Sequence, residues 1–119
     1  MFRKPNDRIV AKIIFPTADM AASIEFYRSL GLEVVSYDDG YAWVRHDGDE
    51  VLHLARVDEL DVEANRAAGY WHVQDADRWF DRLAAGSPGP IVDQPWGMRE
   101  FALRTPDGHR IMVGEPSGA

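Results

Sequence analysis

The chain has 119 residues, 45% of them apolar, and it contains no cysteine. This length supports one domain with a single sizeable core. The lack of cysteine excludes disulfides, thiolate metal sites and thiol nucleophiles, and it favours a reducing compartment, which we take to be the cytoplasm. No apolar run approaches the roughly 20 residues that cross a bilayer, and residues 1–8 are too polar for a signal peptide.

Asp and Glu outnumber Lys and Arg by 20 to 13, so the formal net charge is −7. This balance argues against nucleic acid as a partner, because phosphates would be repelled, and it favours a neutral or cationic partner. Solubility alone explains the charge equally well. The charge therefore narrows the class of partner without identifying it.

The first half of the sequence predicts a βαβββ unit. Residues 9–15 form a β-branched run that predicts a strand ended by Pro16. Residues 19–30 carry apolar side chains at helical spacing, and Asp19 and Gly31 suit the start and end of that helix. The next predicted elements are strands at 32–37, 41–46 and 51–55, with Asp-Gly turns at 39–40 and 47–48 between them.

The second half repeats this order. Residues 70–73 predict a strand, and Asp75 takes the place of Asp19, 56 residues later. Residues 76–83 have the apolar spacing of a second helix, which Gly86 is expected to end. The remaining predicted elements are an extended stretch from Ile91, a strand at 100–104, a turn at 106–108 and a strand at 110–113.

Two βαβββ units in succession predict an α+β domain built from a repeat. We expect a single domain over residues 1–119, with a first module at 9–57 and a second at 68–115. Residues 58–67 are polar and acidic, which is typical of a linker between modules.

Histidine spacing does not predict a metal site. The four histidines show no H-x-x-x-H or H-E-x-x-H pattern. His46 and His109 lie beside Asp-Gly turns and are expected in solvent, whereas His53 and His72 lie within predicted strands, where hydrogen-bonded packing is their more common role. No serine occupies a G-x-S-x-G nucleophile elbow, and the chain has no phosphate-binding glycine loop.

Large rings are frequent for so short a chain, which has four Trp and four Tyr. Trp79 lies on the apolar side of the second predicted helix and is expected in the core. Trp96 lies in the turn sequence Gln-Pro-Trp-Gly, where it is either a lid over the edge of the core or a stacking surface for a planar ligand. Tyr70 and Trp71 are consecutive in a strand, so only one of them lines a given cleft.

Two stretches resemble a known family. The run S-I-E-F-Y followed by L-G-L, at 23–32, is similar to the vicinal oxygen chelate superfamily, which includes glyoxalase I, extradiol dioxygenases and fosfomycin- and bleomycin-resistance proteins. The segments Q-P-W-G, R-E-F-A-L-R and P-D-G, at 94–108, resemble the bleomycin-binding proteins most closely. The resemblance implies curved mixed sheets that surround a cleft.

In the enzymes of this superfamily, metal ligands occupy the first and last strands of the modules. The resemblance places three of these positions at Lys12, Ala68 and Met112, whose side chains do not bind a divalent cation as His and Glu do. His53 is chemically capable, but one ligand does not make a site. The resemblance therefore implies no metal, no cofactor and no catalytic residue.

In the bleomycin-resistance proteins the drug lies between the subunits of a homodimer, stacked on aromatic rings. Trp96 matches the loop Trp of that cleft, Gly108 matches a glycine beside it, and Tyr41 matches an aromatic residue in the β-hairpin. The predicted ligand-binding residues are Trp96, Gly108, Tyr41, Tyr70, Trp71, Tyr37 and Ser36.

The resemblance leaves three points open. Either Tyr70 or Trp71 corresponds to a second cleft Trp. Ser36 falls where the family has an aromatic residue, and Tyr37 is the adjacent ring. Residues 1–8 are expected to form an arm that reaches across to a partner subunit.

The predicted function is that of a homodimeric, non-enzymatic protein that sequesters a bleomycin-type antibiotic without modifying it. The partner would be a cationic, aromatic small molecule, with no nucleic acid or membrane involved. One alternative is a metal-dependent glyoxalase-like lyase or dioxygenase. Another is a binding module for a different metabolite.

Overall fold

The first module contains β1 (Ile14–Thr17), α1 (Met20–Ser29), β2 (Glu33–Asp38), β3 (Tyr41–His46) and β4 (Asp49–Arg56). The second contains β5 (Ala68–His72), α2 (Ala76–Arg82), the 3₁₀ helix η1 (Ala84–Gly86), β6 (Val92–Asp93), β7 (Met98–Arg104) and β8 (Arg110–Pro116). These elements come from a computed structural model that describes residues 7–117. Most of the predicted N-terminal arm at 1–8 therefore lies outside the described residues.

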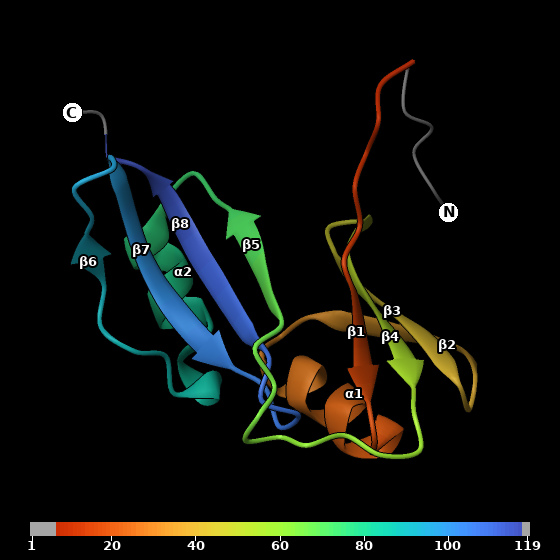
Figure 1. Cartoon of the computed structure of the whole chain (residues 1–119). Coiled ribbons are helices and arrows are strands. Elements are labelled where there is room, and N and C mark those ends of the chain that lie inside the picture. Colours follow the sequence, from red (N-terminus) through yellow and green to blue (C-terminus); the bar gives the residue numbers. More distant parts are fainter. Residues whose placement is uncertain (1–6, 118–119) are drawn as a thin grey trace.

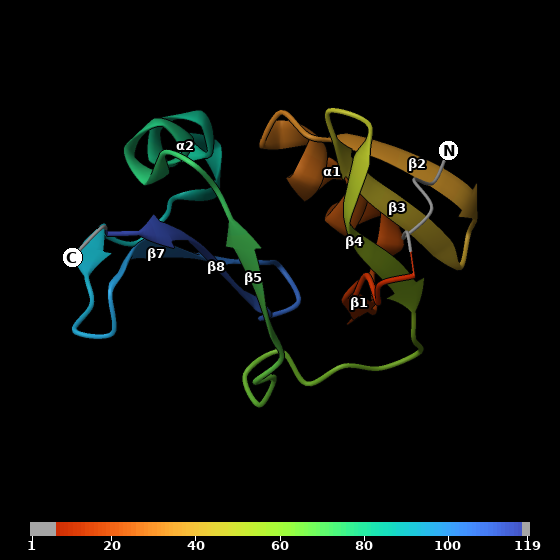
Figure 2. The ribbon, with the colours of Figure 1, turned by 90° about the horizontal axis from the view of Figure 1, so that it is seen from above.

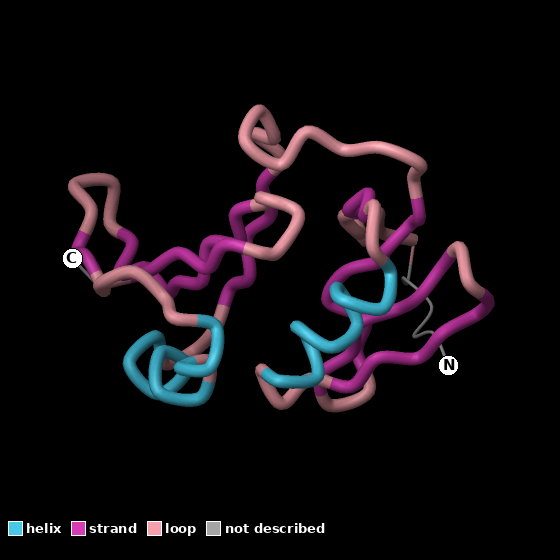
Figure 3. The backbone as a smooth tube through the Cα atoms, turned by 90° about the horizontal axis from the view of Figure 1, so that it is seen from below, coloured by secondary structure: helices cyan, strands magenta, loops and turns pink. Residues whose placement is uncertain are grey.

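The two modules have the same topology (Figure 1). The strand order is β1-β4-β3-β2 in one sheet and β5-β8-β7-β6 in the other. β1 runs parallel to β4 and β5 runs parallel to β8, whereas the other pairs are antiparallel. Figures 2 and 3 show both helices on one side of the molecule and the linker between β4 and β5 on the opposite side. The predicted α+β fold of two βαβββ modules is confirmed.

Both helices begin at the predicted capping residues. Asp19 Oδ1 accepts a hydrogen bond from the Ala22 N–H and Asp75 Oδ1 from the Arg78 N–H, each at 3.0 Å. Each carboxylate thus satisfies a backbone donor that the helix leaves free. After α1, Gly31 has a φ of +84°, the left-handed stop that its position predicts. No helix in the described chain combines the length and apolar character that a membrane span requires.

The first strand differs from its prediction. β1 begins at Ile14 instead of residue 9, and it continues through Pro16, which pairs with Ala55. A proline is tolerated because β1 is the edge strand of its sheet, where the missing N–H is not needed for a second neighbour. Before the strand, the Ile13 carbonyl already accepts from the His53 N–H at 2.9 Å.

Gly86 does not end the second helix, contrary to the prediction. α2 ends at Arg82, and the left-handed residue that follows η1 is Ser87, with a φ of 51°. A Cβ on Gly86 would lie 2.8 Å from Leu30 Cδ2 and 3.0 Å from Leu103 Cδ2. Gly86 suits this position because η1 packs closely against a leucine of each module.

One core serves both modules. In Figure 2 each helix covers one face of its own sheet, and strand residues alternate between this covered face and an uncovered one. Tyr27 of α1 is buried as its helical spacing predicts, while Trp79 of α2 is partly buried and packs against the core. The buried cluster includes Phe15, Leu54, Leu103 and Ile111.

His109 is buried, contrary to the expectation that it lies in solvent. It is 1% exposed, its ring stacks on Phe15 with 4.0 Å between centroids, and its Nδ1 is hydrogen-bonded to Thr105 Oγ1 at 3.0 Å. Burial lowers the pKa of His109 from its ordinary value of 6.5, and the nearby Asp107 opposes part of this shift. The prediction is wrong because the turn beside His109 packs against the first module instead of facing water.

The turn between β7 and β8 binds the start of α1. Asp107 Oδ2 accepts a hydrogen bond from Ser23 Oγ at 2.8 Å, and Oδ1 accepts from the Ala18 N–H at 3.3 Å. Asp107 and Ser23 are both buried. A buried carboxylate of the second module therefore depends on donors of the first.

Candidate functional site

The uncovered face of the first sheet carries a group of aromatic rings. On β3, Tyr41 and Trp43 alternate with Ala42 and Val44, which are fully buried on the helix-covered side. The rings of Tyr41 and Trp43 meet edge to face at 6.0 Å between centroids, and so do those of Tyr37 and Trp43. We call Tyr37, Tyr41 and Trp43 the aromatic face.

Strand alternation places Tyr37 on this face together with Val35, and an irregularity in β2 leaves Tyr37 unpaired. Ser36 pairs with Ala42 and Asp38 pairs with Tyr41, so Tyr37 is an extra residue between two pairs. Its ring is 73% exposed and reaches Trp43. Ser36, in contrast, lines a recess on the α1 side of the sheet. Of these two predicted site residues, the structure places only Tyr37 on the aromatic face.

A chain of three hydrogen-bonded side chains supports Tyr41. Glu50 Oε1 lies 2.6 Å from His53 Nε2, and His53 Nδ1 lies 2.6 Å from the Tyr41 hydroxyl. The side chains of His53 and Glu50 are 14% and 4% exposed. Glu50 and His53 are three residues apart, and a regular strand would place them on opposite faces. They share a face because Arg45 pairs with Glu50 and Val44 pairs with Leu52, which leaves an extra residue in β4.

With Glu50 as a carboxylate and the His53 ring neutral, the hydrogen bonds of this network take one consistent direction. An ionised Glu50 only accepts, so His53 donates through Nε2–H and its Nδ1 becomes an acceptor. The Tyr41 O–H then donates to Nδ1, and the phenolic oxygen keeps acceptor capacity for a ligand. In this arrangement the Tyr41 oxygen can accept a hydrogen bond from an N–H group of a ligand that lies on the aromatic face.

The uncovered face of the second sheet carries Tyr70. Its hydroxyl donates to Glu100 Oε1 at 2.8 Å, and Glu100 is 5% exposed. A Cβ on Gly114 would lie 2.3 Å from the Tyr70 oxygen, so this glycine lets the ring lie across β8. Burial and the bond to Glu100 raise the pKa of Tyr70 to about 12.

Trp71 points to the other side of β5, as the alternation predicts. Its Nε1–H donates to the Val51 carbonyl in the first module at 3.1 Å. Trp71 is partly buried and packs against the core. Of the two alternatives at this point of the chain, Tyr70 lies on the uncovered face and Trp71 holds the modules together.

Trp96 occupies the tip of the turn between β6 and β7. The Gln94 N–H donates to the Met98 carbonyl at 2.7 Å, the Gly97 N–H donates to the Gln94 carbonyl at 3.0 Å, and Gly97 has a φ of +87°. Trp96 is 67% exposed. A ring with so much free surface does not act as a lid over the core of a single chain, so the alternative of a stacking surface is favoured.

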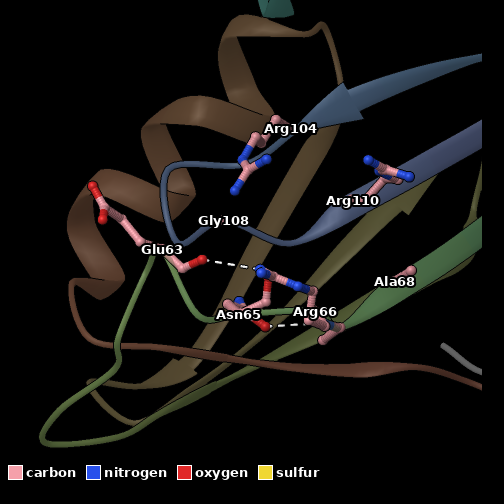
Figure 4. Close-up of a pocket in the computed structure, with 8 residues that line it drawn as sticks. Glu63, Asn65, Arg66, Ala68, Arg104, Gly108 and Arg110 are labelled. Carbon is pink, nitrogen blue, oxygen red and sulfur yellow. Dashed lines mark hydrogen bonds between the residues drawn. The ribbon is translucent and has the colours of Figure 1, made fainter.

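Gly108 lies in the turn that follows β7, whereas Trp96 lies in the turn that precedes it. It has a φ of +88°, and it lines a pocket together with residues of the linker (Figure 4). The aromatic face belongs to the other module. Within one chain, the structure brings Tyr37 and Tyr41 together but not Trp96 and Gly108.

The positions that bind metal in the enzymes do not offer a donor set for a divalent ion here. Lys12 Nζ donates to the Glu50 carbonyl at 2.9 Å, and Ala68 and Met112 supply a methyl group and a thioether. Both ring nitrogens of His53 are engaged in the chain of hydrogen bonds described above. These residues do not fit the superfamily's metal ion.

One trio of carboxylates comes together elsewhere in the described part of the chain. Asp75, Asp77 and Glu115 have oxygens within 4.8 Å of one another. Each already has a structural partner, since Asp75 caps α2, Asp77 pairs with Arg99, and Glu115 accepts from the Ala76 N–H. Asp77 is bound by the Arg99 guanidinium, which lowers the pKa of that carboxyl. The trio is accounted for by the packing of α2.

The architecture of paired βαβββ modules is that of the superfamily the sequence resembles. A model of the Glyoxalase/Bleomycin resistance protein/Dioxygenase superfamily matches residues 9–113. The chain belongs to this superfamily. Comparison with curated proteins found no match.

Solved structures share the fold over almost the whole chain. A bleomycin-binding protein complexed with bleomycin gives a TM-score of 0.81 at 20% identity, covering 91% of this chain and 98% of that one. The bleomycin-binding protein of Streptomyces verticillus, complexed with copper(II)-bleomycin, gives 0.75 at 26% identity, with 90% and 95% covered. A glyoxalase-related enzyme from Clostridium phytofermentans gives 0.70 at 22% identity, with 94% and 99% covered. The similar structures thus include both binding proteins and an enzyme relative.

Sequence reasoning missed the Glu50–His53–Tyr41 chain. The sequence predicts Tyr41 as a ligand-binding residue and His53 as strand packing, but it links neither of them to Glu50. The link depends on the extra residue in β4, and strand alternation alone gives no signal for it.

Proposed function

We propose that this protein binds a bleomycin-type antibiotic, large, partly aromatic and cationic, and holds it without chemical change. The observation that carries the proposal is the aromatic face, where the exposed ring of Tyr37 and the partly buried rings of Tyr41 and Trp43 meet, and where the Tyr41 oxygen is free to accept a hydrogen bond. Rings offer stacking surface for planar groups of such a drug. The Tyr41 oxygen suits an ammonium or amide N–H.

Charge and the lack of a suitable metal site agree with this proposal. A net charge of −7 attracts a cationic ligand. Lys12, Ala68 and Met112 do not supply metal ligands, so we propose that the protein is not an enzyme. Since the chain has no cysteine, we further propose that it works in the cytoplasm.

We also propose that the working form is a homodimer. In one chain the aromatic face lies on one module, while Tyr70 and Trp96 lie on the other. A two-fold pairing could set the first sheet of one subunit against the second sheet of its partner and so build one cleft from both sets of rings. Ile14, at 53% exposed, and Tyr37, at 73%, are apolar surface that such pairing would cover.

Titration with bleomycin, followed by tryptophan fluorescence, tests the binding. Tyr37→Ala should weaken binding by about 1–3 kcal/mol, the order seen when a stacking platform loses a ring. Ser36→Ala is the matched control, because Ser36 precedes Tyr37 in the chain but its side chain lies on the α1 side of the sheet. This variant should bind bleomycin like the wild type. If Tyr37→Ala bound bleomycin as tightly as the wild type, the aromatic face would not be part of the binding site.

Two further measurements test the rest of the proposal. Mass spectrometry of drug released from the complex should recover it unmodified. Sedimentation at micromolar concentration should give twice the 13.4 kDa mass of the chain. A stoichiometric metal that survives dialysis, together with an activity lost on chelation, would favour the lyase or dioxygenase alternative instead.

A further inference from the structure

The pocket that Gly108 lines lies away from the aromatic face. It has a volume of about 430 Å³ and is bounded by the end of the linker, the start of β5 and the β7–β8 turn (Figure 4). Arg66, Arg104 and Arg110 all line it. We call this recess the arginine pocket. In a chain with more acidic than basic residues, three guanidinium groups around one recess require an explanation.

Two of these arginines are set directly opposite each other. Arg104 on β7 pairs in register with Arg110 on β8. Like charges in such cross-strand positions destabilise a sheet unless something neutralises them. Among residues 7–117, the arginine that forms ion pairs with aspartates is Arg99, and no carboxylate pairs with Arg104 or Arg110.

The third arginine is held in place by the backbone. Arg66 donates through Nη1 to the Glu63 carbonyl at 2.9 Å. Its neighbour Asn65 donates through Nδ2 to the Asp107 carbonyl at 2.9 Å, which ties the linker to the β7–β8 turn. Figure 4 shows the Glu63 carboxylate pointing away from the arginines. The linker side of the pocket is therefore fixed, whereas Arg104 and Arg110 are exposed side chains, and no carboxylate of the described residues pairs with them.

Gly108 keeps the wall of the pocket close. A Cβ at this position would lie 2.3 Å from the Val62 carbonyl oxygen, so only glycine lets the linker lie directly on the turn. The same contact sets Arg66 on the linker beside Arg104 and Arg110 on the strands.

We propose that the arginine pocket binds an oxyanion, either a carboxylate or a phosphate group of a small molecule. Guanidinium groups present planar forks that bind both kinds of anion in a bidentate manner. Such an anion would neutralise the Arg104–Arg110 opposition. This site lies in the second module and the linker, and it does not depend on drug binding at the aromatic face.

Thermal melting and amide NMR test the proposal with inorganic phosphate and with acetate as separate probes, each compared with chloride at equal ionic strength. Phosphate or acetate should raise the Tm and shift the amide signals of Gly108 and Arg110. The probe with the larger effect identifies the preferred anion. Binding should weaken as sodium chloride is added.

Arg104→Gln and Arg110→Gln should each raise the Kd for the anion at least about tenfold, since a hydrogen bond to a charged group is lost. The control Arg78→Gln removes an exposed arginine on α2, and it should keep wild-type anion binding. In chloride alone, Arg104→Gln should raise the Tm by about 1–4 °C, because it relieves the like-charge opposition.

Three results would overturn the proposal. One is the absence of any effect of phosphate and acetate beyond that of chloride. Another is full retention of anion binding in both Arg104→Gln and Arg110→Gln. The third is a lower Tm of Arg104→Gln in chloride, which would mean that the guanidinium already has a favourable partner.

Discussion

Removing the Tyr41 hydroxyl tests both the hydrogen-bonded chain and the proposed contact with the drug. In Tyr41→Phe the Nδ1 of His53, whose side chain is 14% exposed, loses its donor. A largely buried acceptor without a partner costs about 1–2 kcal/mol of stability. Tyr27→Phe is the matched control, because the Tyr27 hydroxyl is buried without a partner in the described structure. That variant should instead gain about 1 kcal/mol, since it removes a buried polar group.

The affinity for bleomycin should fall in only one of these two variants. A hydrogen bond from a cationic donor to the Tyr41 oxygen is worth about 1.5–3 kcal/mol, so Tyr41→Phe should raise the Kd roughly 10- to 150-fold. Tyr27→Phe should bind like the wild type. Urea unfolding gives the stability of each variant, and fluorescence titration gives the affinity. If Tyr41→Phe bound the drug as tightly as the wild type, the phenolic oxygen would not be a contact.

Three further predictions concern the rings, the buried histidine and a turn glycine. Trp96→Ala should weaken bleomycin binding by about 1–3 kcal/mol, while Trp79→Ala should mainly lower stability, by about 2–3 kcal/mol in urea unfolding, because Trp79 packs against the core. Because the pKa of His109 is lowered in the fold, below about pH 6.5 the unfolded chain takes up a proton that the folded chain does not. Stability measured by urea unfolding should therefore be full above this pH and fall below it by at most about 1.4 kcal/mol per pH unit, and His109→Phe should remove this slope. Gly108→Ala should cost about 2–4 kcal/mol, because its Cβ would meet a linker carbonyl at 2.3 Å, whereas Gly48→Ala, with a φ of +83° and open space, should cost about 1 kcal/mol in the same assay. Equal losses in the two glycine variants would contradict the packing argument.

Much of the fold follows from local signals in the sequence. Asp19 and Asp75 cap their helices as predicted, because capping needs only a carboxylate and the N–H groups of the next turn. The alternation at Tyr70 and Trp71 likewise predicts that the two rings point to opposite faces of the sheet. Such signals succeed because the partners are neighbours along the chain.

Features that depend on long-range packing could not be predicted in this way. His109 is buried because Phe15 of the other module stacks on it, and no local sequence pattern around residue 109 predicts that partner. Pro16 lies inside a strand because that strand is at a sheet edge, which is a property of the whole sheet. The candidate site shows the same limit, since Glu50 reaches His53 only through an irregular pairing with the neighbouring strand.

The contact between Asp107 and the start of α1 makes the two halves of the repeat one cooperative unit. A fragment that ended in the linker would lose the acceptor of the Ser23 hydroxyl and expose the face of Phe15 that His109 covers. A fragment that began in the linker would carry a carboxylate whose donors are missing. We therefore expect that the two halves do not fold independently, although they are similar. We expect the intact chain to melt in a single transition, and a fragment of residues 7–57 to give the circular dichroism spectrum of an unfolded peptide.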